Sequence, residues 1–375
     1  MKILRDGSRA RVVRAAALGL AAAVLVAGCG AADDLSPASG GSAPSAAGTP
    51  LRGALSGAGA SSQQAAMQAW ITWFTSANPD ASVDYDPAGS GVGRSRFVAG
   101  GVEFAASDAY LKPDELAKAS GRCQGDVVEV PAYVSPIAVV YNLPGVSDLR
   151  LSPATVAAIF TGRITDWNAP EIAAENPGTQ LPNQPITPVH RSDDSGTTQN
   201  FTDYLEETSG GVWSADPAGT WPVPGGEAVQ GTAGVVSAVQ GGNGTIGYAD
   251  ESQAGGLGKA LIKVGDRYTG PTREAAAAVL GVSERVAGRG DSSFAYDLAR
   301  DTTAEGTYPI VLVSYLIACA RYPDRLQADL VRGLLTYAVS ADGQRVAAQS
   351  AGSAPLPDDL RALITPAVAG ISAGI

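Results

Sequence analysis

Three turns in this sequence combine glycine with hydroxyl side chains, a combination suited to binding an oxyanion. They are Ser61-Ser62 after the small-residue segment 56–60, Gly89-Ser90-Gly91, and Ser195-Gly196-Thr197. Each stands where a strand is expected to end and a helix to begin. Helix N-termini expose unpaired N–H groups, glycine allows close backbone approach, and a hydroxyl adds an uncharged donor. A single serine before a helix is most often a cap, and Gln64 would complete a capping box with Ser61. Three such turns together predict an anion site.

One cation and two carboxylates stand beside these turns. Arg191 lies four residues before Ser195, and a guanidinium can meet two phosphate oxygens at once. Asp193 is close enough in sequence to orient Arg191 and offset its charge; a surface salt bridge is the alternative. Asp108 follows an expected strand, at the end where open α/β sheets bind ligands. We predict that a carboxylate there accepts a hydrogen bond from an oxyanion that carries a proton and, as acceptor against acceptor, rejects a fully ionised one such as sulfate.

The sequence contains little that would support catalysis. His190 is the only histidine, so a Ser-His-Asp triad would have one possible base, with Arg191 as an unfavourable neighbour. There is no G-x-x-x-x-G-K-[ST] phosphate loop and no Cys-x-x-Cys pair. The acidic pairs Asp33-Asp34 and Asp193-Asp194 lack a calcium-loop pattern. We expect no enzyme activity, no metal and no cofactor, with a structural or rim position for His190.

The composition restricts the class of partner. The chain has 375 residues, a length that suggests two domains, and its 45% hydrophobic residues can build a sizeable core. The formal net charge of −11 would repel nucleic acid. An anionic ligand would therefore have to be attracted by local dipoles and by one or two placed cations.

The N-terminal segment predicts export. A basic region is followed by an apolar run, Ala15–Ala27, that is too short to span a bilayer comfortably. The run ends in Val26-Ala27-Gly28-Cys29, which resembles the lipobox of bacterial lipoproteins, in which Cys29 would carry a diacylglyceryl group. An ordinary cleaved signal peptide is the alternative. The following residues to about Pro50 are mostly Ala, Ser, Gly and Pro, a composition typical of a flexible tether.

Cys123 and Cys319 are the two remaining cysteines. In an exported protein two thiols more often pair than stay free, which favours a disulfide between them. Two separate buried thiols are the alternative.

Short apolar runs alternate with helical periodicity from Leu51 onward, which indicates an α/β protein. A first helix at 62–76 would place Met67, Trp70, Ile71 and Phe74 on one apolar face. The other expected helices are 153–160, 197–205, 273–280, 294–300, 324–340 and 358–364. The expected strands are 83–85, 104–106, 133–141, 186–189, 245–248 and 310–317.

These motifs resemble, in order and approximate spacing, the phosphate-binding component of the bacterial phosphate ABC importer. The matching segments are 55–61, Gly89-Ser90-Gly91, Ala106-Ser107-Asp108, 161–168, 175–178, 191–197, 244–248 and Pro355-Leu356-Pro357. The resemblance extends from about Leu51 to the C-terminus. It implies a monomeric carrier that holds inorganic phosphate outside the cell membrane, anchored by lipid on the outer face, and passes it to ABC permease subunits.

The resemblance also implies residue roles. Phosphate would receive hydrogen bonds from Ser61, the Ser62 backbone, Ser90, Ser195, Gly196 and Thr197. Arg191 would supply positive charge, Asp193 would brace Arg191, and Asp108 would accept the proton of phosphate. The family usually has phenylalanine where this chain has Ser62, so an aromatic wall of the cleft would be lost.

The expected architecture is a two-lobed, type II periplasmic-binding-protein-like α/β fold with a hinge and an interlobe ligand cleft. The predicted parts are a lipoprotein signal peptide at 1–28, a tether at 29–52, lobe one at 53–135 and 310–375, and lobe two at 136–309. The chain would cross between the lobes near Ser135 and return near Ile310.

Three other functions fit parts of the pattern. The first is a carrier for another tetrahedral oxyanion, such as sulfate or molybdate, which the carboxylate of Asp108 argues against. The second is a surface phosphatase, which release of phosphate from an ester would reveal. The third is an adhesin or sensor that retains only the fold. Failure to bind any free anion would support this function.

Overall fold

The computed structural model describes residues 50–374. The predicted signal peptide, Cys29 and the tether up to residue 49 lie outside these described residues, so lipidation and tethering stay predictions. Within 50–374, none of the helices combines the length and the apolar character needed to cross a membrane.

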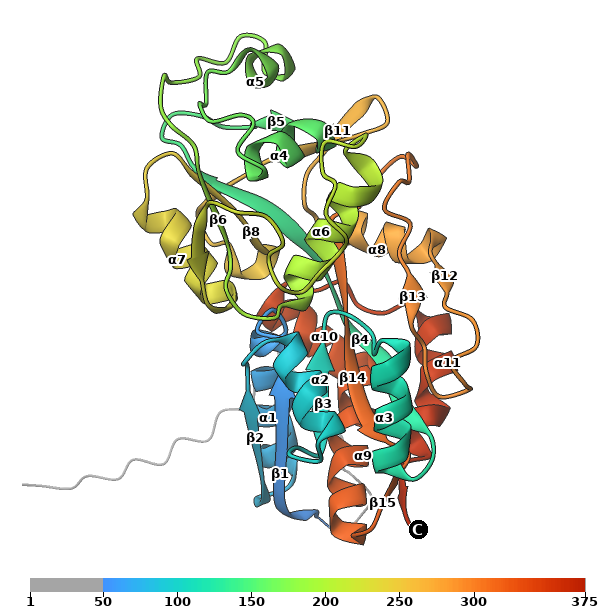
Figure 1. The fold of residues 1–375 in the computed structure, drawn as a ribbon. Coiled ribbons are helices and arrows are strands. Elements are labelled where there is room, and N and C mark those ends of the chain that lie inside the picture. Colours follow the sequence, from blue (N-terminus) through green and yellow to red (C-terminus); the bar gives the residue numbers. More distant parts are fainter. Residues whose placement is uncertain (1–49, 375) are drawn as a thin grey trace, which may run out of the picture. The chain divides into compact units, whose positions relative to one another are not determined.

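One mixed sheet forms the centre of the structure (Figure 1). Its strands run in the order β2-β1-β3-β14-β4-β8-β6-β7, with β9 also paired to β4. Strand β1 is parallel to β2 and β3, and β6 is parallel to β7 and β8, whereas β4 and β14 are antiparallel to their neighbours. The bounds are β1 (Arg52–Gly59), β2 (Asp80–Asp86), β3 (Phe104–Ser107), β4 (Val127–Asn142), β6 (Thr187–Arg191), β7 (Glu227–Val229), β8 (Thr245–Asp250), β9 (Gly258–Lys259) and β14 (Val311–Cys319).

The long strand β4 connects the two halves of this sheet. Its residues 127–136 pair with β14, and its residues 137–142 pair with β8. Where the partner changes, the N–H of Ile137 donates to the carbonyl of Ile310 at 2.7 Å. This change lies beside the two predicted crossing points, Ser135 and Ile310. The described residues 50–374 belong to one compact unit, so the division into lobes stays a proposal.

Helices cover the sheet, and several begin where local sequence signals predict. Helix α4 starts at Pro153 after Ser152, whose side chain accepts the N–H of Thr155. Helix α1 buries Met67, Trp70 and Phe74 as predicted, whereas Ile71 is only half-buried. The helices are α1 (Gln64–Ala77), α2 (Ser90–Val98), α3 (Pro113–Cys123), α4 (Pro153–Phe160), α5 (Pro170–Glu175), α6 (Gly196–Thr208), α7 (Gly231–Gly241), the 3-10 turn η1 (Glu251–Gln253), α8 (Arg273–Val282), α9 (Arg325–Val339), α10 (Ala341–Ala351) and α11 (Asp358–Ala369).

Short strands complete the architecture outside the main sheet. One small sheet has the order β11-β10-β5, and β12–β13 and β15–β16 form separate pairs. Their bounds are β5 (Arg150–Leu151), β10 (Leu261–Val264), β11 (Arg267–Thr269), β12 (Glu284–Arg285), β13 (Tyr296–Asp297), β15 (Arg321–Tyr322) and β16 (Ser372–Ala373).

The prediction of a helix at 294–300 is wrong. This stretch contains β13, which pairs with β12. The N–H of Phe294 donates to the carbonyl of Glu129 at 2.8 Å, and the N–H of Tyr296 donates to the Tyr315 hydroxyl at 3.0 Å. Tertiary partners thus use the backbone groups that a helix would have paired internally.

The segment around β12 and β13 is fixed to β4 by a buried acid. Glu129 is fully buried and accepts hydrogen bonds from Arg289 Nη2 at 2.7 Å and from Ser293 Oγ at 2.6 Å. This segment lies within the range proposed for lobe two, yet Glu129 lies in the range proposed for lobe one. The two proposed lobes therefore share an extended contact along β4.

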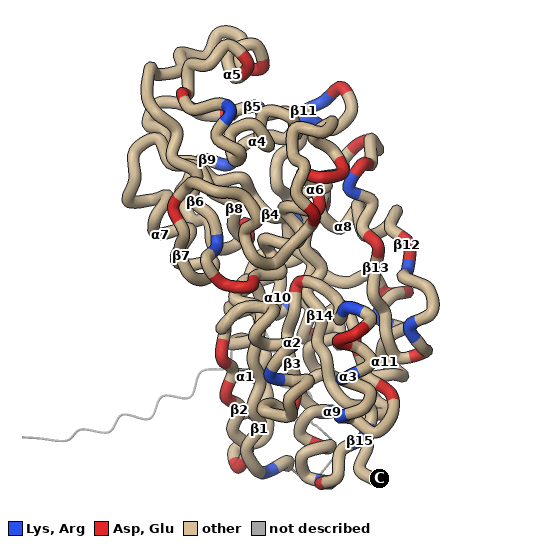
Figure 2. The backbone as a smooth tube through the Cα atoms, in the orientation of Figure 1, with Lys and Arg blue, Asp and Glu red and all other residues tan. Residues whose placement is uncertain are grey.

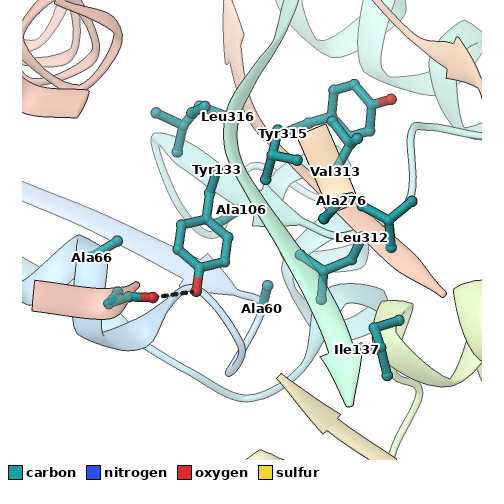
Figure 3. Packing of buried hydrophobic residues seen from close by; sticks show 14 of the residues in the cluster. Ala60, Ala66, Ala106, Tyr133, Ile137, Ala276, Leu312, Val313, Tyr315 and Leu316 are labelled. Atoms are coloured by element: carbon teal, nitrogen blue, oxygen red, sulfur yellow. Dashed lines mark hydrogen bonds between the residues drawn. The ribbon is translucent and has the colours of Figure 1, made fainter. Parts of the chain in front are cut away.

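The core is centred on β4 and β14, whose residues are almost all buried. Figure 3 shows the ring of Tyr133 among apolar side chains that include Ala60, Ala106 and Leu316. The Tyr133 hydroxyl lies at the polar end of this packing, 3.1 Å from the carbonyl oxygen of Ala351. The Tyr133 hydroxyl is therefore a polar group inside the core, beside the sheet.

The predicted disulfide between Cys123 and Cys319 is confirmed. It joins the last residue of α3 to the last residue of β14, with a Cα–Cα distance of 5.2 Å and a sequence separation of 196 residues.

Removing this disulfide should lower stability without changing ligand binding. A closed loop of this length restricts the unfolded chain by about 5 kcal/mol in the entropic model. We expect Cys123→Ala with Cys319→Ala to lower the free energy of unfolding by about 3–5 kcal/mol, measured by urea denaturation. Phosphate affinity, measured on the folded double variant, should stay within about twofold of the parent; a larger loss would show that the bridge shapes the binding site.

Candidate anion-binding site

Asp108 joins all three predicted hydroxyl turns. Its carboxylate accepts hydrogen bonds from Ser62 Oγ, at 2.7 and 2.8 Å to its two oxygens, and from Thr197 Oγ1 at 2.9 Å. Its backbone N–H donates to Ser90 Oγ at 3.1 Å. Asp108 follows β3 directly and is 3% exposed. The structure therefore brings together residues that are up to 135 positions apart, counted from Ser62 to Thr197.

Burial destabilises the charged form of Asp108, so its carboxylate needs several hydrogen-bond donors. Burial raises the pKa of its carboxyl group above the ordinary value, although the hydrogen bonds from Ser62 and Thr197, the nearby hydroxyl of Ser314 and the charge of Arg191 act in the opposite direction. A buried carboxylate of this kind is best satisfied by donors on every side. A ligand that brings its own proton would add such a donor.

Arg191 is held by Asp193 at the end of β6. The Nε of Arg191 donates to Asp193 Oδ1 at 2.7 Å, and Nη2 donates to Oδ2, so the pair is bidentate. Burial would raise the pKa of Asp193, but the hydrogen bonds and charge of Arg191 bring it below the ordinary value. The third guanidinium nitrogen, Nη1, lies 3.5 Å from Thr232 Oγ1. Arg191 is 2% exposed, so its charge acts within a desolvated site.

The third turn presents the N-terminus of α6 to Asp108. Ser195 caps this helix, because its Oγ accepts the N–H of Thr198 at 3.2 Å. The N–H groups of Gly196 and Thr197 belong to the first turn and have no partners inside the helix. A Cβ atom at Gly196 would lie 2.6 Å from Ser90 Oγ and 2.7 Å from Asp108 Cβ. Only glycine allows the helix to approach the other two turns this closely.

Substituting Gly196 should test this close approach. We expect Gly196→Ala to weaken phosphate binding by about 10- to 100-fold, because overpacking of this size typically costs about 1–3 kcal/mol. Calorimetric titration of the parent and the variant measures the effect. Gly281→Ala is the matched control, since this helical glycine of α8 has no atom within 4 Å of an added Cβ.

The first turn differs from its prediction. Residue Gln63, not Ser61, stands at the N-cap position of α1, without a side-chain cap, so the predicted capping box is wrong. Ser61 Oγ instead lies 3.1 Å from Thr232 Oγ1 and accepts the N–H of Thr232 at 3.2 Å. Ser62 contributes its side chain to Asp108 and not only its backbone. Tertiary contacts with other elements have replaced the local cap.

Three site residues were missed in the sequence. Thr232 in Gly231-Thr232 opens α7 and repeats the glycine–hydroxyl pattern of Gly196-Thr197, so a pattern existed that could have identified it. Asn200 Nδ2 donates to the carbonyl of Asp108 at 2.7 Å, and Gln253 Nε2 donates to the carbonyls of Ser61 and Ser62, each at 3.0 Å. No local pattern marks either of these two side chains.

His190 has a structural environment. Its ring stacks on Trp221 at 4.8 Å between centroids, and its nitrogens lie 3.0 and 3.1 Å from the carbonyl oxygens of Arg191 and Gly225. The imidazole thus contacts backbone acceptors beside the site.

Comparison with known proteins identifies the family. The family described as the PBP superfamily domain matches residues 44–342. The phosphate-binding protein PstS 2 of Mycobacterium tuberculosis is 33% identical over 99% of this chain and 100% of the relative, and PstS of Xylella fastidiosa is 31% identical over 82% of each. A phosphate-binding protein from Stenotrophomonas maltophilia has a similar fold, with a TM-score of 0.67 at 20% identity over 84% of this chain and 93% of that structure.

The predicted periplasmic-binding-protein-like α/β fold is confirmed by these matches. The resemblance that the motifs suggested is confirmed as well, because the relatives match the chain almost from end to end. The chain belongs to the PBP superfamily and, within it, to the family of the PstS phosphate-binding proteins.

Proposed function

We propose that this chain binds inorganic phosphate between two lobes outside the cell membrane and delivers it to the permease subunits of an ABC importer. The observation that carries the proposal is the convergence of three hydroxyl turns on the buried residue Asp108, together with a guanidinium that Asp193 braces and whose charge acts on the Asp108 carboxylate. The names of the relatives, which are phosphate-binding proteins, support the same ligand.

The proposed ligand set relies on neutral donors. The donors are the hydroxyls of Ser61, Ser90 and Ser195, the backbone N–H groups of Ser62, Gly196 and Thr197, and the guanidinium of Arg191. The hydroxyls of Ser62 and Thr197 donate to Asp108, and Ser195 also caps the α6 turn. In Figure 2 the acidic and basic positions of residues 50–374 are scattered over many elements. Attraction for an anion would therefore come from helix N-termini and from Arg191, whose charge Asp193 partly offsets.

Contacts between distant elements support closure around the ligand. Asp108 belongs to proposed lobe one, and it accepts hydrogen bonds from Thr197 and Asn200 of proposed lobe two. Ser61 makes a similar contact with Thr232. An anion that meets donors from both lobes would favour the closed arrangement, because only that arrangement satisfies all its oxygens.

The cellular setting is proposed from the sequence. A lipidated Cys29 would keep the protein on the outer face of the membrane, where the tether lets it reach the permease. The family is one of transport proteins, and we propose that the chain acts as a monomer without catalysis.

Titration of the purified chain with phosphate and with sulfate, followed by tryptophan fluorescence, tests the function. We expect saturable binding of phosphate in the micromolar range or tighter, about −8 kcal/mol or better, and much weaker binding of sulfate. Tighter binding of sulfate or molybdate would favour a different oxyanion carrier. Release of phosphate from an ester would favour a phosphatase, and no binding of any anion would refute the proposal.

A further inference from the structure

A second buried acid, Asp250, lies next to the anion site without a cation among its described partners. It is the last residue of β8, pairs with Ile137 where β4 changes partner, and is fully buried. Its carboxylate accepts hydrogen bonds from the N–H of Ser252 at 3.0 Å and from Ser252 Oγ at 2.5 Å. Tyr133 Oη lies 3.1 Å from each of its oxygens. A buried acid whose hydrogen-bond partners are all uncharged is expected to favour its neutral form.

The hydrogen-bond count around Tyr133 also favours a proton on Asp250. The single hydroxyl hydrogen of Tyr133 has three acceptors within 3.1 Å, the two oxygens of Asp250 and the carbonyl of Ala351. If Asp250 is protonated, it donates to Tyr133 Oη, and Tyr133 donates to Ala351. Every group is then satisfied. If Asp250 is ionised, either its carboxylate or the carbonyl at the end of α10 loses that donor.

The charged group that acts on Asp250 is another acid, Asp108. Burial raises the pKa of Asp250 to about 7, and the nearby charge of Asp108 adds to this effect. The next residue, Glu251 of η1, is paired with Lys259 of β9. Helix α7, which packs against η1, contains no ionisable side chain. The hydroxyls of Ser135 and Ser314 face Asp250 and Asp108 respectively, but neither reaches a partner at normal hydrogen-bond geometry among the described residues.

Asp250 also connects to the first hydroxyl turn. Its side chain caps η1 through Ser252. The same turn carries Gln253, whose Nε2 donates to the carbonyls of Ser61 and Ser62. Asp250 thus helps to set the orientation of the backbone that presents two of the proposed phosphate donors.

We propose that Asp250 is a positioning residue of the phosphate site, which holds the Ser61–Ser62 turn through Gln253 and takes up a proton from solvent when phosphate binds. This inference rests on the proposed function. An anion close to Asp108 makes ionised Asp250 more costly, so the bound state keeps the proton to higher pH than the free state does. Well below pH 7 both states are protonated, and the ionisation of Asp250 has no effect on affinity. Above this pH the affinity falls until the bound state also loses the proton.

Calorimetric titration with phosphate between about pH 6 and pH 8.5, in buffers of different ionisation enthalpy, tests the proposal. We expect the parent to take up more protons than Asp250→Asn at pH 8, and its affinity to fall up to about tenfold more over this range. The comparison removes the contribution of phosphate's own ionisation, which is common to both proteins. Asp266→Asn, an exposed position in the β10–β11 turn, controls for the loss of one negative charge.

Two further variants separate the two roles of Asp250. Gln253→Leu should weaken binding by about tenfold at every pH while keeping the pH slope of the parent, because it removes only the contacts to the turn. Tyr133→Phe should shift the fall in affinity to lower pH, since it removes the hydroxyl oxygen to which protonated Asp250 donates. If Asp250→Asn fails to fold, Tyr133→Phe still tests whether the proton on Asp250 affects phosphate affinity.

The outcomes are distinguishable. Equal proton uptake and equal pH slopes in the parent, Asp250→Asn and Tyr133→Phe would overturn the role of Asp250 and leave phosphate binding intact. A parent that binds no phosphate at any pH would instead overturn the proposed function.

Discussion

Replacing Arg191 with methionine should weaken phosphate binding by about 100- to 1,000-fold or more. Methionine keeps an apolar stem of similar length but removes the guanidinium that Asp193 holds in bidentate geometry. Hydrogen bonds to charged groups contribute about 1.5–3 kcal/mol, and removing one partner of a buried ion pair typically costs about 3–5 kcal/mol. Here the loss would leave Asp193 as an uncompensated negative charge beside the incoming anion.

The double variant Arg191→Met with Asp193→Asn separates the two contributions. If part of the loss comes from the unpaired carboxylate, the double variant should bind phosphate at least about tenfold better than Arg191→Met alone. Arg267→Met is the matched control, because the Arg267 side chain is 70% exposed and lies in β11. Calorimetry with phosphate measures all four proteins. A single variant that binds within tenfold of the parent would show that Arg191 is not a ligand.

Replacing Asp108 with asparagine should reduce the discrimination between phosphate and sulfate. In the parent, fully ionised sulfate would place an acceptor against the buried carboxylate, at a cost of several kcal/mol. Asparagine offers an amide donor at the same place. We expect sulfate affinity to rise by at least about 100-fold and phosphate affinity to fall by about tenfold. The Asp266→Asn variant serves again as the surface control.

The pH dependence of sulfate binding gives an independent check on Asp108. Burial raises the pKa of this carboxyl group, so the neutral form is reached at a higher pH than for an ordinary aspartate. As the pH falls through this raised pKa, the protonated group becomes a donor, and the rejection of sulfate by the parent should weaken. Asp108→Asn should show no such change. Rejection that is equally strong in the parent and the variant at neutral pH would refute this account of selectivity.

Local chemistry made parts of this protein predictable from sequence. Helix α4 occupies 153–160 as expected, because Ser152 caps it and Pro153 suits its first turn. The predicted strand at 133–141 lies inside β4, since a continuous β-branched and aromatic run suits a strand buried on both faces. The glycine–hydroxyl turns were visible for the same reason, because close backbone approach and helix capping each need particular residues at neighbouring positions.

Other features depended on partners far away in the chain. The stretch 294–300 contains a strand because Glu129 and Tyr315 take its backbone groups. Ser61 bonds to Thr232, 171 residues away, in place of capping α1. Nothing near these residues in sequence indicates such partners.

The sequence by itself determined the types of group available to the site: hydroxyls, glycines, one guanidinium and a carboxylate at a strand end. Only the tertiary structure decided that Asn200 would meet Asp108 across 92 residues, and that Asp250 would meet Tyr133 across 117. The physical reason is the range of the interactions. Caps and strand patterns act over a few residues, whereas the partners of a buried carboxylate are set by strand order and register, which depend on the whole sheet.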